Sequence, residues 1–166
     1  MTNSVYATAA SEDVARRIVE DLRARGIMSE NISALFPDKS SSREFAEEQN
    51  TKLPEGATAG AGVGGVLGGS LGWLVGAGTL AIPGLGPFIA AGPILAALSG
   101  AAAGAAVGGL TGALIGLGIP EHEVKHYENR LGEGSILISV QARDRSEAEQ
   151  VKDLFERDGA KDVSVT

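Results

Sequence analysis

The chain contains no cysteine, which excludes disulfide bonds, thiolate chemistry and zinc sites built on cysteine. Charge is absent from one long stretch, because residues 56–120 include no Asp, Glu, Lys, Arg or His. All 35 charged residues, 14 basic and 21 acidic, lie in the two flanks and give a net charge of −7. Neither flank has a basic cluster, so we expect no nucleic-acid partner held through its phosphates.

The first residues lack the basic group and apolar run that are typical of a secretory signal peptide. We therefore expect no such signal. The charged flanks are expected to face the cytoplasm.

Both flanks have the pattern of a β-α-β unit. In the first, residues 5–9 and 32–36 predict strands on either side of a helix that begins after Ser11 and ends at Gly26. The second flank repeats this plan 133 positions later, where Gly159 matches Gly26. One such unit cannot bury a core alone, so the two units are expected to pair. The predicted fold is α+β and ferredoxin-like, with a four-stranded antiparallel sheet and two helices on one face.

This fold predicts a split ferredoxin-like domain, built from residues 1–55 and 121–166 and interrupted by residues 56–120. Strand alternation assigns side chains to two faces of the sheet. The face expected to pack against the helices has Val5, Ala7, Ile32, Ala34, Ile136, Ile138, Val140, Val163 and Val165. The semi-polar face has Tyr6, Thr8, Ser33, Leu35, Leu137, Ser139, Gln141 and Ser164. We expect this second face either to be solvated or to dock another copy or a partner.

Two short helices are expected beside the charge-free segment. One is acidic and lies within residues 40–49, and the other lies within 120–130. The second has an inward stripe of Val124, Tyr127 and Leu131. His122 and His126 also lie on it, but the spacing places no third metal ligand, so we interpret them as part of a solvated helix face.

The charge-free segment contains 20 of the 24 glycines, and ten of them form two ladders with a spacing of four. The ladders are Gly60, Gly64, Gly68, Gly72, Gly76 and Gly100, Gly104, Gly108, Gly112, Gly116. A glycine inside a helix costs about 1 kcal/mol relative to alanine, so close helix packing must offset the cost. The ladders predict a glycine-zipper hairpin with helices over 57–80 and 94–118. The connection over 82–93 has three prolines and cannot be one straight helix.

Two environments could cover such a hairpin. A helix of 24 residues spans about 36 Å, enough to cross a hydrocarbon core of about 30 Å. Against a membrane, the hydrophobicity of the segment is modest, and no cluster of Lys or Arg marks the cytoplasmic end of a membrane helix. Trp73 is the only aromatic residue that could lie at a membrane–water interface. The leading prediction is a transmembrane hairpin with lipid as a partner. The alternative is a soluble homo-oligomer whose hairpins pack in a central core.

Five short segments of the sequence carry a family resemblance: Val5–Thr8, Glu48–Ala57, Ile82–Pro87, Ala91–Pro93 and Gly118–Glu121. The chain resembles the bacterial heat-induced general stress protein family of the YflT type, over nearly its whole length. The resemblance implies a stress-linked bacterial protein with a glycine-zipper hairpin. It implies no catalytic residue.

From these observations we expect a non-enzymatic protein with no catalytic, cofactor-binding or metal site. The leading hypothesis is a stress-associated bacterial membrane protein that self-associates through its glycine-zipper hairpin and presents the α+β domain in the cytoplasm. The alternative is a cytoplasmic, homo-oligomeric structural protein.

Overall fold

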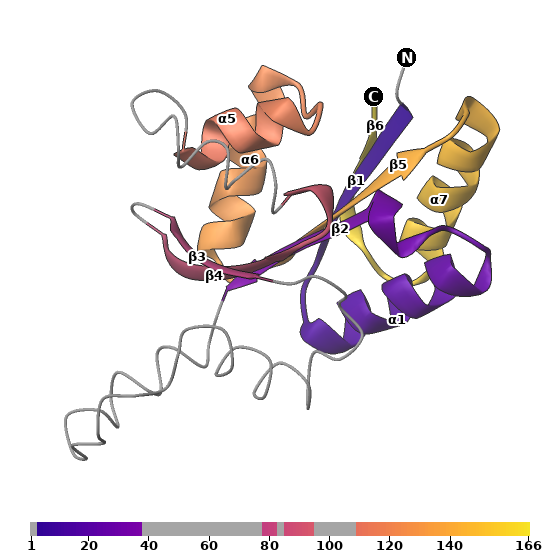
Figure 1. Cartoon of the computed structure of the whole chain (residues 1–166), viewed down its shortest axis with the longest axis horizontal. Helices are drawn as coiled ribbons and strands as arrows, with labels where there is room; N and C mark the ends of the chain where they lie inside the picture. Colours follow the sequence, from indigo (N-terminus) through magenta and orange to yellow (C-terminus); the bar gives the residue numbers. More distant parts are fainter. Residues whose placement is uncertain (1–2, 38–77, 83–84, 95–108) are drawn as a thin grey trace.

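A computed structural model describes residues 3–37, 78–82, 85–94 and 109–166 (Figure 1). It is α+β, with one six-stranded sheet. The strands are β1 Asn3–Ala9, β2 Ile32–Pro37, β3 Gly78–Ile82, β4 Gly86–Ala91, β5 Ile136–Ala142 and β6 Lys161–Val165. The helices are α1 Glu12–Ala24, α5 Gly109–Gly116, α6 Glu121–Gly132 and α7 Arg145–Arg157, with a short 3-10 helix η1 at Ser29–Asn31.

The order of strands in the sheet is β3-β4-β2-β5-β1-β6, and every neighbouring pair is antiparallel. The four strands predicted from the flanks lie together as β2-β5-β1-β6. The prediction of a four-stranded sheet is wrong in number, because β3 and β4 extend the sheet beyond β2. Both added strands come from the segment without charge.

The predicted start of α1 after Ser11 and the predicted glycines after both helices are confirmed, and Asp144 begins α7 in the same way as Ser11 begins α1. The Ser11 hydroxyl accepts a hydrogen bond from the Val14 amide at 3.4 Å, and the Asp144 carboxylate accepts one from the Glu147 amide at 2.8 Å. Side-chain oxygens at these positions satisfy amides that the first helical turn leaves unpaired. After each helix a glycine has a positive φ, 84° at Gly26 and 88° at Gly159.

Helices α1 and α7 cover one face of the sheet, as Figure 1 shows, and they bury the apolar face predicted from strand alternation. From the helices, the core includes Ala15, Ile18, Val19, Leu22, Ala148, Val151, Leu154 and Phe155. The strands contribute Val5, Ala7, Ala9, Ile32, Ala34, Phe36, Ile89, Ile136, Ile138, Val140 and Ala142. The prediction is wrong for Val165, which is 38% exposed because it ends the edge strand β6.

The helix predicted over 57–80 is wrong at its C-terminal end, where residues 78–80 belong to β3. Strand β3 pairs with β4 over five consecutive residues, and β4 pairs with β2. Pairing with β4 satisfies the backbone groups along one side of this short segment, and such tertiary context overrides helical periodicity. Residues 57–77 of that helix, and the predicted acidic helix within 40–49, lie outside the described residues.

The helix predicted over 94–118 is described at its C-terminal part as α5. Helix α5 ends at Gly116, two residues before the predicted end, and Gly118 in the following turn has a φ of 98°. The Gly118 amide donates to the Ile115 carbonyl at 2.8 Å, and the Ile119 amide donates to the Leu114 carbonyl at 3.1 Å. This pair of bonds is the Schellman arrangement that glycine favours at helix ends. Residues 95–108 lie outside the described part.

Gly92 fastens the added strands to β2. Its φ is 79°, and a Cβ atom at this position would lie only 2.1 Å from the carbonyl oxygen of Ile32. Two residues later, the Ile94 amide donates to the Ser33 hydroxyl at 3.2 Å, and the Ile94 side chain is fully buried. The turn after β4 therefore requires a residue without a side chain.

We expect Gly92→Ala to lower the free energy of unfolding by about 2–5 kcal/mol, since it combines backbone strain with a clash against backbone. Urea denaturation followed by circular dichroism measures this loss. Gly134→Ala is the matched control, because Gly134 also has a positive φ but a Cβ there would meet no described atom within 4 Å. It should cost only about 1–2 kcal/mol. Equal losses in the two variants would contradict the role of Gly92.

Candidate functional site

The second face of the sheet is neither solvated nor open to a partner as predicted, because helices α5 and α6 cover it (Figure 1). Tyr6, Leu35 and Leu137 of this face form a second core with residues from the charge-free segment and from α6. The other members are Phe88, Ala90, Ile94, Leu110, Leu114, Leu117, Ile119, Val124, Tyr127 and Leu131. The inward stripe predicted for Val124, Tyr127 and Leu131 is thereby confirmed.

Tyr6 connects this cover to the centre of the sheet. Its side chain is fully buried, and its hydroxyl donates a hydrogen bond to the carbonyl oxygen of Leu117. That carbonyl lies at the end of α5, where helices leave acceptors without an internal partner. Burial raises the pKa of Tyr6, so its hydroxyl keeps the proton that it donates. A Cβ at Gly118 would lie 2.8 Å from the same hydroxyl, so this turn also requires glycine.

A polar cluster fastens α6 to the edge strand β6. The Asp162 carboxylate accepts a hydrogen bond from the Thr8 hydroxyl at 2.7 Å. It also lies 2.9 Å from His126 Nε2 and 2.9 Å from Arg130 Nε. The Tyr127 hydroxyl donates to the Asp162 carbonyl at 2.8 Å. Asp162 has a φ of 52°, a conformation that aspartate tolerates better than most residues.

These contacts determine the ionisation of two groups. Partial burial opposes ionisation of Asp162, but the hydrogen bonds from Thr8 and His126 and the charge of Arg130 outweigh it and lower its pKa. Burial raises the pKa of Tyr127, and the nearby carboxylates Glu123 and Asp162 raise it further. The cluster therefore holds a charged acid against neutral and cationic donors.

His122 and His126 were interpreted from the sequence as part of a solvated helix face, and their surroundings differ in the structure. The His126 side chain is half exposed and contacts Asp162, whereas the His122 side chain is 80% exposed and lies 3.7 Å from Glu123. Among the described residues, no three potential ligand side chains gather as a metal site would require.

Helix α5 presents an uncharged outer face. Gly112, Ile115 and Gly116 recur with the helical spacing of three and four, and Ile115 is 43% exposed. A Cβ at Gly112 or Gly116 would meet no described atom within 4 Å. On the same helix, the Thr111 hydroxyl donates to the Glu128 carboxylate of α6. Helix α5 thus contacts the second core through Leu110 and Leu114 and bonds to α6 through Thr111. Gly112 and Gly116 face away from these contacts.

Of the ten ladder glycines, Gly112 and Gly116 are the two whose surroundings the structure describes. The other eight lie outside the described residues: Gly60, Gly64, Gly68, Gly72, Gly76, Gly100, Gly104 and Gly108. The described atoms place no second helix against Gly112 or Gly116. The glycine zipper therefore stays a prediction. Across the described ranges, no helix combines the length and apolar character needed to cross a bilayer.

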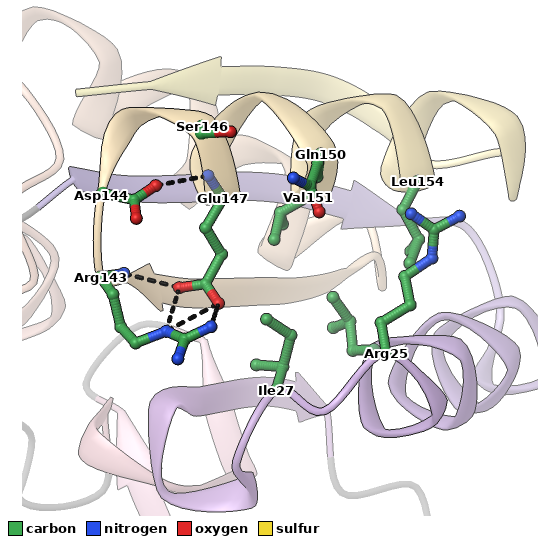
Figure 2. A pocket seen from close by; sticks show the side chains of 10 residues that line it. Arg25, Ile27, Arg143, Asp144, Ser146, Glu147, Gln150, Val151 and Leu154 are labelled. Carbon is green, nitrogen blue, oxygen red and sulfur yellow. Dashed lines mark hydrogen bonds and ion pairs between the residues drawn. The ribbon is translucent and has the colours of Figure 1, made fainter.

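A pocket of about 160 Å³ lies between the end of α1 and the start of α7 (Figure 2). Its lining residues are Leu22, Arg25, Ile27, Arg143, Asp144, Ser146, Glu147, Gln150, Val151 and Leu154. Arg143 Nη2 donates to the Glu147 carboxylate at 2.7 Å, and the Arg143 amide donates to the same group at 2.7 Å. These bonds lower the pKa of Glu147, and Asp144 caps the helix. Arg143 and Glu147 thus pair with each other, and Asp144 is used by the start of the helix, so we assign the pocket no ligand.

The contact of α5 and β4 with the second face was not expected from the sequence. One signal could have revealed it. Leu35 and Leu137 form an apolar centre on that face, and Leu110, Leu114 and Leu117 recur with helical spacing in the segment that glycine dominates.

We expect Tyr6→Phe to lower the free energy of unfolding by about 1–3 kcal/mol, because it leaves the buried Leu117 carbonyl without a donor. Thermal and urea denaturation measure the loss. Thr111→Val is the control, since it removes an exposed hydrogen bond on the same side of the sheet. Its effect should stay within about 0.5 kcal/mol. A Tyr6→Phe protein as stable as the wild type would refute the proposed role of this hydroxyl.

The lowered pKa of Asp162 predicts a loss of stability in acid. A carboxyl with a lower pKa in the folded state stabilises the fold above its unfolded pKa, and this contribution disappears as pH falls through the folded pKa. Asp162→Asn should therefore be less stable than the wild type at pH 7, and the difference should shrink below about pH 4. Urea denaturation across this range measures the difference. Asp153→Asn changes an exposed carboxylate on α7 and should show no such trend.

No family model matches the chain, and comparison with curated proteins and with solved structures also finds no match.

Proposed function

We propose that the chain is a non-enzymatic structural protein that self-associates through its charge-free segment. The observation that carries this proposal is the outer face of α5, where Gly112, Ile115 and Gly116 form an uncharged surface. Small residues at this spacing let a second helix approach closely. The two flanks contain all the charge and would remain on the outside of such an assembly.

The strand pairing favours a protein environment over the bilayer for this segment. A hairpin that crossed a membrane over 57–80 and returned over 94–118 would leave β3 and β4 on the far side. Strand β4 instead pairs with β2, which precedes the hairpin, in the register Leu35 to Ala90. The 14 residues 95–108 would extend only about 21 Å as a helix, short of a hydrocarbon core of about 30 Å. We therefore propose the homo-oligomeric alternative.

The α+β part supports a more specific fold proposal. The order β2-β5-β1-β6, with α1 and α7 on one face, has the strand arrangement expected for a ferredoxin-like fold. We interpret the domain as a ferredoxin-like core that β3 and β4 extend at one edge. The resemblance to general stress proteins supports a role in a stress response. In this proposal the oligomer performs the role, and no catalytic residue takes part.

Gly112→Leu tests the association surface. No described atom lies within 4 Å of a Cβ at this position, so the described fold should tolerate the side chain while a second copy should not. We expect the dissociation constant of the oligomer to rise at least about tenfold, which corresponds to roughly 1.4 kcal/mol. Sedimentation equilibrium measures this change.

Glu149→Leu is the matched control, because it adds the same side chain to an exposed site on α7. It should leave association unchanged. A wild-type chain that stays monomeric at high concentration would overturn the proposal, as would unchanged association of Gly112→Leu. Alkaline extraction of cell membranes separates the two environments, since retention in the membrane pellet would favour the bilayer.

A further inference from the structure

The two outer edges of the sheet differ in how they are protected. Edge strands expose unpaired backbone groups, and proteins commonly shield them with charge or with irregular backbone. Strand β6 has both devices. Lys161 is exposed, Asp162 has a positive φ, and the pairing of β6 with β1 shifts register between Tyr6 and Thr8.

Strand β3 has neither device. Its five residues, Gly78–Ile82, contain no charge and no proline, and they pair with β4 without a register shift. Along its other side, the described ranges contain no strand. The backbone groups of this side therefore form a regular template for a further antiparallel strand.

We propose that β3 pairs with β3 of a second copy, antiparallel about a two-fold axis, so that two six-stranded sheets join into one. This inference rests on the proposed self-association and names a second surface for it, separate from the outer face of α5. Charge decides the occupant: each copy has a net charge of −7, and all 35 charged residues lie outside 56–120. At β3 two copies meet without bringing like charges together. A two-fold contact also closes on itself, so the β3 contact by itself joins two copies and no more.

The proposed pairing has a geometric signature. A two-fold axis between identical antiparallel strands places one residue directly opposite its own copy. Opposite residues have Cα atoms about 4.5–5.5 Å apart, which is within the range of a disulfide bond. The chain has no cysteine, so a single introduced thiol can form a disulfide only between copies.

The experiment uses three single-cysteine variants of the full chain, Thr79→Cys, Leu80→Cys and Ala81→Cys, under mild oxidation. We expect at least one to convert more than half of the chain to a dimer on non-reducing gels, and reductant should reverse it. Val165→Cys, on the shielded edge β6, is the matched control and should remain largely monomeric on the gel. Dimer formation by Val165→Cys at the same rate would overturn the proposal, since the thiols would then be reacting without a specific contact.

A charged residue on the same strand gives an independent readout. Thr79→Lys places like charges on both copies at the contact, so it should raise the dissociation constant of the dimer at least about tenfold. If the wild type is oligomeric but none of the three thiols cross-links, the β3 contact is wrong and the proposed self-association through α5 still stands. A monomeric wild type would refute both. If a segment of the same chain covered β3, the wild type would still be oligomeric, but none of the three thiols would cross-link.

Discussion

Burial of the second face of the sheet is the constraint on which the rest of the structure depends. The two β-α-β units supply helices for one face only, and Tyr6, Leu35 and Leu137 leave an apolar centre on the other. An antiparallel sheet can leave one face in water, but this apolar centre favours a cover. Helices α5 and α6 provide it, and the Tyr6 hydroxyl satisfies the carbonyl that ends α5. The described strands and helix of the inserted segment, β3, β4 and α5, therefore pack as part of the same domain.

The flanks could be predicted because their signals are local. Ser11 and Asp144 begin helices and Gly26 and Gly159 end them, by hydrogen bonds and backbone angles that a few neighbouring residues determine. The charge-free segment lacks such contrast, since it has no polar face against which an apolar face can be recognised. Its residues 78–82 and 86–91 form strands because β2 offers an edge, and that edge exists only in the folded sheet. Glycine spacing predicted a helix up to residue 80, and the three prolines of 82–93 indicated only that this connection is not one straight helix.

The candidate site was predictable in part for the same reason. The ladder positions Gly112 and Gly116 do lie on one face of a helix, as the spacing of four requires. The contact of this helix's leucines with the sheet was not predictable in the same way, because it depends on the apolar centre around Tyr6. Tyr6 and Leu117, which meet there, are more than 100 positions apart in the chain. The cluster around Asp162 could not be predicted from the sequence either, because its residues come from strand β1, helix α6 and the edge strand β6, which lie in distant parts of the chain.

The glycines of the charge-free segment therefore divide into two physical classes. Gly92 and Gly118 have positive φ, and a Cβ at either would meet an atom of the sheet, so the fold of a single copy explains them. Gly112 and Gly116 have helical backbone and no described atom near a Cβ position, and alanine there would stabilise an isolated helix. Nothing within the described copy rewards glycine at these two positions. A surface that a neighbouring helix approaches closely is the physical condition under which they become favourable, and this is the reason for placing association on α5.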